Sequence, residues 1–154
     1  MPIPTDAQIR EQIAAAIQIA APKAIVFPFW VIGFNETDWP GALISPNDEK
    51  RVHGYVIGRR ETDGFKRGNG CVRRTYGYFI LGMHYYSGGP VTNNSEKLFS
   101  AEVDAITDKF DKPELLNSIL ARVQPLKLEC FMRTLGQQVH ISRGTLFLSP
   151  CDSP

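Results

Sequence analysis

Apolar residues recur with helical spacing near the start of the chain. Ile9, Ile13 and Ile17 fall on one face of a helix, with smaller or polar residues between them. Thr5 or Asp6 can serve as the N-cap, because a short oxygen-bearing side chain accepts a hydrogen bond from the first turn. A proline follows shortly and cannot continue a helix. The pattern predicts an amphipathic helix that ends before that proline.

A second helical pattern begins after a Gly-Gly-Pro break. Asn93 precedes Glu96 at the spacing of a capping box, in which the two residues satisfy backbone donors of the first turn. The expected buried stripe consists of Leu98, Phe99, Val103, Ile106 and Phe110. The residues expected to face water are Glu102, Asp104, Asp108 and Lys109. A short further helix, capped by Asp111, is expected to run through Leu120.

Alternating or β-branched residues predict strands elsewhere. The run from Ala24 to Gly33 is expected to be an edge strand, because Pro28 removes one ladder donor. A turn-rich loop is expected from Asn35 to Asp48. Two hairpins are expected: residues 51–60 with 72–86, joined by a long glycine-containing tip, and residues 124–134 with 137–148, which turn at Gly136.

This element order lacks the regular strand–helix alternation of doubly wound folds. The sequence therefore predicts an α+β fold: a mainly antiparallel mixed sheet with two principal helices packed on one face. A chain of 154 residues fits a single domain, 1–154. In its core, the helix residues Val103, Ile106 and Phe110 are expected to face Leu126, Leu128 and Met132.

Composition excludes several classes of protein. The net charge of +1 gives no global field that would attract nucleic acid or an acidic membrane. The apolar stretch from Ile13 to Gly33 is interrupted by polar residues and prolines, so no membrane span is expected. The start of the chain lacks the features of a signal peptide. Cys71, Cys130 and Cys151 have long spacings that fit thiols in a reducing compartment, with Cys130 expected in the core.

No motif of known chemistry is present: the sequence has no phosphate-binding loop, no HExxH and no nucleophile elbow. His53, His84 and His140 all fall on predicted strands and could converge on a metal ion, but their spacing has no ligand signature. Each is therefore expected to be a partly buried hydrogen-bonding residue. The sequence predicts a protein that is not an enzyme and that binds no cofactor or metal.

Positive charge is concentrated on the first hairpin. This cluster, here named the basic arm, comprises Arg59, Arg60, Lys66, Arg67, Arg73 and Arg74. Three interpretations are open: a solvated hairpin whose charges discourage aggregation, a contact arm that pairs with an acidic face of a neighbouring subunit or partner, and a phosphate contact. The excess of arginine over lysine favours forked pairing with carboxylates.

Aromatic residues are abundant on the second strand of that hairpin. Tyr76, Tyr78, His84 and Tyr86 can share one face, opposite a set that includes Phe79. If helices cover only one side of the sheet, rings on both sides suggest that the second face meets another protein, with those four residues as candidate contacts. The alternative is ordinary tyrosine at a wet sheet surface.

With these elements placed, the chain resembles the tail-terminator (tail-completion) proteins of long-tailed bacteriophages. The resemblance is one of architecture over nearly the whole chain and does not depend on a short motif. The features that carry it are the helix from Thr5 to Ala20 running into Phe27-Pro28-Phe29-Trp30, the hairpin from Arg51 to Tyr86, the helix from Ser95 to Phe110, and the hairpin from Gln124 to Leu148.

The resemblance implies a ring, typically a hexamer, at the head-proximal end of the tail tube in a virion assembled in the host cytoplasm. Such a ring would stop growth of the tail tube protein and offer a docking face to a head-completion or connector protein, while DNA passes through the lumen without specific binding. The family has no catalytic residues to carry over. Two alternatives are another neck or tail protein, such as a stopper or connector-adaptor, and a small cytosolic α+β enzyme or ligand-binding domain.

Overall fold

The computed structural model describes residues 5–66, 72–88, 94–111, 120–122 and 125–150. For residues 59–66, 72–74, 120–122 and 150 it describes the backbone alone. In chain order the elements are α1 (Asp6–Ala20), β1 (Ile25–Phe27), η1 (Glu36–Asp38), α2 (Trp39–Ala42), β2 (Ile44–Ser45), β3 (Arg51–Lys66), β4 (Val72–Tyr85), α3 (Ser95–Asp111), β5 (Leu120–Arg122), β6 (Glu129–Thr134) and β7 (Gln138–Pro150).

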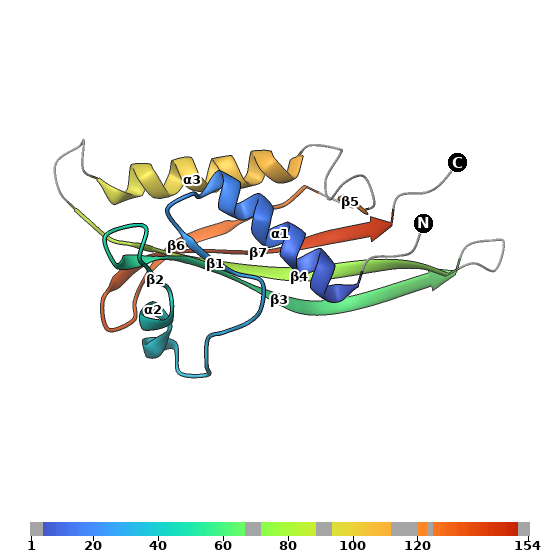
Figure 1. Ribbon diagram of the computed structural model, residues 1–154, viewed down its shortest axis with the longest axis horizontal. Coiled ribbons are helices and arrows are strands. Elements are labelled where there is room, and N and C mark those ends of the chain that lie inside the picture. The colour runs from blue at the N-terminus through green and yellow to red at the C-terminus, as the bar shows by residue number, and fades with distance from the viewer. Residues whose placement is uncertain (1–4, 67–71, 89–93, 112–119, 123–124, 151–154) are drawn as a thin grey trace.

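The strands form a mixed and mostly antiparallel sheet, which confirms the predicted α+β class (Figure 1). The order across the sheet is β1-β3-β4-β7-β5, with β2 paired to β3 and β6 paired to β7. Only β1 runs parallel to its neighbour, β3, among the pairings in the described residues. β7 therefore lies inside the sheet, between β4 on one side and β5 and β6 on the other.

Helix α1 begins with the predicted cap. The Thr5 side chain accepts from the Gln8 backbone, and the Gln8 side chain accepts from the Thr5 backbone, which completes a capping box. Ile9, Ile13 and Ile17 are all buried, as the spacing predicts. Two hydrogen bonds also attach the helix to the sheet. The Tyr78 hydroxyl of β4 donates to Asp6, and Arg10 donates to the Ile57 carbonyl of β3.

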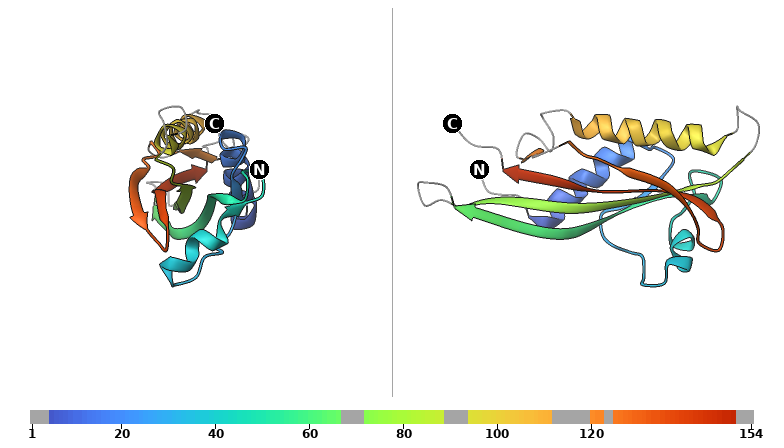
Figure 2. Two further views of the ribbon diagram at one scale, coloured as in Figure 1. Left: turned by 90° about the vertical axis from the view of Figure 1, so that its left-hand side faces the viewer. Right: turned by 180° about the vertical axis from the view of Figure 1, so that it is seen from behind.

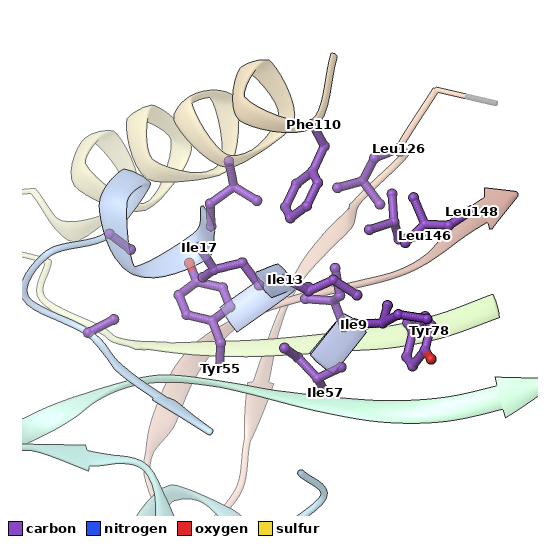
Figure 3. Packing of buried hydrophobic residues seen from close by; sticks show 14 residues of the cluster. Ile9, Ile13, Ile17, Tyr55, Ile57, Tyr78, Phe110, Leu126, Leu146 and Leu148 are labelled. Atoms are coloured by element: carbon purple, nitrogen blue, oxygen red, sulfur yellow. The ribbon is translucent and has the colours of Figure 1, made fainter. Parts of the chain in front are cut away.

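Helices α1 and α3 cover the same face of the sheet (Figures 1 and 2). Between helices and strands lies the larger hydrophobic core, in which Phe110 of α3 and the isoleucines of α1 meet Tyr55, Leu126 and the strand residues of β4 and β7 (Figure 3). Most of the predicted stripe of α3 is buried. Leu98 is the exception: it is 51% exposed and does not belong to that stripe.

The opposite face carries a second hydrophobic cluster. Val56 of β3, Leu81 and Met83 of β4, and Ile141 of β7 are buried there against Leu43. They are covered by the segment that follows β1 and includes α2, which lies on the side of the sheet away from α1 and α3 (Figure 1). The two principal helices are on one face, as predicted, but the other face is also partly covered.

Several predicted element boundaries are wrong. The strand predicted from Ala24 to Gly33 ends at Phe27, directly before Pro28, which has no N–H for the ladder. The loop predicted from Asn35 to Asp48 contains η1, α2 and β2. The strand predicted from residue 124 begins only at Glu129, and Leu120 lies in a strand instead of a helix. Residues 112–119 and the predicted cap Asn93 lie outside the described residues; Asn94 caps α3 by accepting from the Glu96 N–H.

The first hairpin is longer than predicted. Its ladder continues to the pair Lys66–Val72, past a bulge between Arg59 and Glu61. Strand β7 accompanies β4 only as far as Tyr76. The outer part of β3 and β4 therefore pairs only with itself among the described residues, and it extends beyond the ends of α1 and β7 (Figure 1).

Candidate functional site

Three histidines lie side by side on the face beneath α3. His53 of β3 is paired in register with His84 of β4, and His84 with His140 of β7. All three side chains are buried. The rings of His53 and His84 have centroids 4.5 Å apart, and those of His84 and His140 are 6.1 Å apart. The prediction that strand histidines are buried hydrogen-bonding residues is confirmed, and they are also neighbours.

His53 is held between two carboxylates from distant parts of the chain. Its Nδ1 lies 2.7 Å from Oδ2 of Asp48, which follows β2, and its Nε2 lies 2.6 Å from Oε1 of Glu102 in α3. The turn between β2 and β3 places Asp48 there, because Glu49 and Lys50 both adopt left-handed backbone angles, with φ of 53° and 56°. That conformation is uncommon for residues other than glycine.

The two carboxylates have further partners. The Tyr55 hydroxyl donates to Oε2 of Glu102 at 2.5 Å, and Arg51 donates to Oδ1 of Asp48. Glu102 was expected to face water, and this prediction is wrong because its side chain reaches back over the sheet. The sequence contained a signal for this position. Glu102 comes three residues after Phe99 and directly before Val103, so it lies at the border of the buried stripe of α3.

The charge states follow from these contacts. Burial lowers the pKa of His53, but the hydrogen bonds and negative charges of Glu102 and Asp48 outweigh it, so the pKa is raised above 6.5. Burial raises the pKa of Asp48, but the hydrogen bonds from Arg51 and His53 dominate and leave it lowered. The cluster, here named the His53 network, comprises Asp48, Arg51, His53, Tyr55 and Glu102.

The other two histidines are in different environments. Burial lowers the pKa of His84 to about 4, and its Nδ1 donates to the Tyr85 carbonyl, so the ring is neutral at pH 7. Burial also lowers the pKa of His140. Its Nε2 lies 2.9 Å from the hydroxyl of Ser95, the first residue of α3. The three adjacent rings therefore do not share one charge state.

A surface depression of about 630 Å³ lies beside the His53 network. Its lining includes Lys23, Tyr85 and Leu98 together with Asp48 and Glu102. No group of three or more His, Cys, Asp or Glu residues in the described part of the chain is arranged to hold a metal ion.

The polar groups of this region serve one another. Both ring nitrogens of His53 are occupied by carboxylates, so neither is free to accept a proton from a substrate. Ser95 resembles a nucleophile beside His140, but it is fully buried, and its hydroxyl also bonds the backbone of Ser87. These hydrogen bonds link α3 to the sheet.

The four aromatic residues proposed as partner contacts lie on the helix-covered side of the sheet or at its end. Tyr78 is fully buried beneath α1, and His84 is buried beneath α3, so neither is available to a partner. Tyr76 packs against the larger core. Tyr86 alone of the four is exposed. The prediction that these residues form a free second face is therefore wrong, because the register of β4 turns them toward the helices.

Two further predictions concern single side chains. Cys130 was expected in the core but is exposed on β6, whereas Cys71 and Cys151 lie outside the described residues. Met132 was expected to face α3 but is 48% exposed. In the basic arm, Arg67 lies outside the described residues, and Arg59, Arg60, Lys66, Arg73 and Arg74 are described by their backbone alone. The contact role of the arm stays a prediction.

An exposed apolar segment follows β1, and the guanidinium of Arg10 in α1 lies over its Phe29 ring, 5.3 Å from the ring centroid. Phe29, Trp30, Val31 and Phe34 follow β1 and are 48%, 41%, 46% and 107% exposed. Trp30 packs against Phe79 of β4, with ring centroids 5.7 Å apart. The sequence pattern had placed the first three of these residues inside the predicted edge strand from Ala24 to Gly33.

Comparison with known proteins found no family that matches the chain and no curated protein similar to it. Within the described segments, no helix combines the length and the apolar character that a membrane crossing requires.

Proposed function

We propose that this protein is a virion structural protein, a subunit of a ring that caps the head-proximal end of a phage tail tube. In this role it stops tube growth and offers a docking face to the neck. The ring, typically a hexamer, contacts itself, the tail tube protein and a head-completion or connector protein. DNA passes through its lumen without specific binding.

The observation that carries the proposal is the exposed apolar segment of Phe29, Trp30, Val31 and Phe34. Several large apolar side chains held in water within a short segment are characteristic of protein contacts, since a monomer gains nothing by exposing them. The projecting β3–β4 hairpin supports the same role because it leaves the body of the molecule and carries the basic arm (Figure 2). The fully paired polar groups of the His53 network support a role without catalysis.

The test is electron microscopy of the purified protein, alone and mixed with polymerising tail tube protein. We expect rings with a central hole and tubes that stop growing once a ring is bound. A protein that remains a monomer at high concentration and leaves tube length unchanged would contradict the proposal.

A second candidate is a small ligand-binding domain, which the depression of about 630 Å³ beside Lys23 and Leu98 favours. Such a domain is expected to be a monomer or dimer and to gain thermal stability from a small molecule. Sedimentation velocity separates the two candidates, because a ring of several 17.2 kDa subunits is much larger than a dimer.

A further inference from the structure

The hydrogen-bond geometry of His53 requires two donors on one ring. Nδ1 and Nε2 each lie within 2.7 Å of a carboxylate oxygen, and an ionised carboxylate can only accept. A neutral imidazole has one N–H, so it satisfies one carboxylate and turns a lone pair toward the other. The geometry therefore assigns the imidazolium form to His53.

This one ring joins three separate segments. Asp48 belongs to the turn after β2, His53 to β3 and Glu102 to α3, which is 49 residues from His53 in sequence. Tyr55 adds a second bond from β3 to the same glutamate. Glu102 lies in the middle of α3, between the buried residues Phe99 and Val103, and its bonds to His53 and Tyr55 add a polar attachment to the apolar contacts of that turn.

We propose that the proton of His53 is a latch that fastens α3 to the sheet, and that its loss at alkaline pH loosens the turn of α3 around Glu102 and widens the adjacent depression. This inference goes beyond the proposed ring and does not depend on it. It concerns a pH-sensitive element of the fold.

Among the described residues, Arg51 is the cation bonded to this network, and it bonds the Asp48 oxygen that does not contact His53. The Arg51 guanidinium stacks on the Tyr85 ring. The titratable and charged groups that face the network are Asp48 and Glu49 from the turn, Arg51 and Tyr55 from β3, His84 and Tyr85 from β4, His140 from β7, Glu102 from α3, and Lys23 from the segment after α1.

The direction of the effect follows from proton linkage. The closed form, with two carboxylates at His53, is expected to bind the His53 proton more tightly than a form in which α3 has carried Glu102 away and Asp48 alone remains. The latch is therefore fully present below the pKa that His53 has in the open form, and it is lost as pH rises through the raised pKa of the closed form. Between these two values, the opening equilibrium of α3 is expected to rise by up to about tenfold per pH unit, since one proton is released.

The experiment measures amide hydrogen exchange across α3 from pH 6 to 9, corrected for intrinsic exchange rates, in the wild type and in two variants. Glu102→Gln removes the charge that holds the proton, and Asp104→Asn makes the same charge change two residues away on the exposed face. We expect protection of the turn around Glu102 to fall with pH in the wild type and in Asp104→Asn. In Glu102→Gln, protection should be lower at pH 6 and nearly independent of pH.

An NMR titration of the histidine ring protons is the companion measurement, and it needs only the wild type if Glu102→Gln fails to fold. His53 should titrate above pH 6.5, and above both His84 and His140. A His53 ring that is neutral at pH 6 would overturn the proposal. An equal pH dependence of α3 protection in all three proteins would overturn it as well.

Discussion

At the scale of residues, the three histidines show that the partner decides the charge state when burial is similar. His53, His84 and His140 are all nearly inaccessible and lie on adjacent strands. The pKa of His53 is raised because two carboxylates outweigh desolvation, whereas the other two rings bond no carboxylate of the described residues and their pKa values are lowered. Residue type and burial alone would predict the same lowered pKa for all three histidines.

Gly82 is required by its neighbour Tyr55. A Cβ atom at Gly82 would lie 2.2 Å from the Tyr55 ring and 2.7 Å from the Ser142 hydroxyl. Since the Tyr55 hydroxyl is bonded to Glu102, the ring cannot move without loss of that bond. We expect Gly82→Ala to lower the free energy of unfolding by about 1–3 kcal/mol, the usual cost of overpacking.

Chemical denaturation measures this effect, with Gly33→Ala as the matched control because a Cβ atom there meets nothing within 4 Å. If the two substitutions have equal effects on stability, the close contact between Gly82 and Tyr55 does not exist in solution.

At the scale of elements, α3 is attached to the sheet by different means along its length. Its first residue, Ser95, is bonded to His140 and to the Ser87 backbone; its middle is bonded through Glu102; and its end is buried through Ile106 and Phe110. The N-terminal half therefore combines these polar contacts with the buried Phe99 and Val103, whereas the C-terminal end is held by apolar burial.

Phe110→Ala tests the apolar end of this helix. The side chain is fully buried in the larger core, so its truncation is expected to lower the free energy of unfolding by about 3–5 kcal/mol. Leu98→Ala, at the exposed position of the same helix, is expected to change it by less than about 0.5 kcal/mol. Urea unfolding of both variants gives the comparison, and a larger loss for Leu98→Ala would mean that the helix faces the other way.

The elements that could be predicted from the sequence are those with a sustained period. Helix α1 and the stripe of α3 were predicted because their apolar residues repeat over three or more turns. The short helix α2 was missed, because its Trp-Pro-Gly sequence has the same turn residues as a loop. The His53 network could not be predicted, because Asp48 and Glu102 meet His53 only through the tertiary fold, and periodicity carries no information about such contacts.

At the scale of the whole molecule, the hairpin is the part that extends furthest from the body. Its outer strands lack any partner other than each other among the described residues, and the sequence places six cations there. Like charges on an isolated arm repel one another, so a neighbouring acidic surface would stabilise it. A single exposed ion pair contributes only about 0–1 kcal/mol, but contacts repeated at every boundary of a ring add up.

We therefore expect Arg67→Glu combined with Arg73→Glu to lower ring yield while each subunit remains folded, and raised salt to have the same effect on the wild type, because salt screens exposed pairs. Ring yield against salt concentration is measured by sedimentation. Lys50→Glu combined with Lys97→Glu is the control, since it makes the same charge change at exposed positions off the arm. If both double variants have the same ring yield and the same salt dependence, the basic arm is only a solvated hairpin and makes no contact in the ring.

The position of β7 inside the sheet has a consequence for how the protein is made. Strands β3 and β4 leave the ribosome long before β7, yet β4 receives its second neighbour only from β7. Until residues 138–150 have been synthesised, the edge of β4 from Tyr76 to Tyr85 is unpaired and available to other nascent chains. The edge of β4 therefore stays exposed while the residues between β4 and β7 are translated. A chaperone that shields strand edges during this time would raise the yield of native protein.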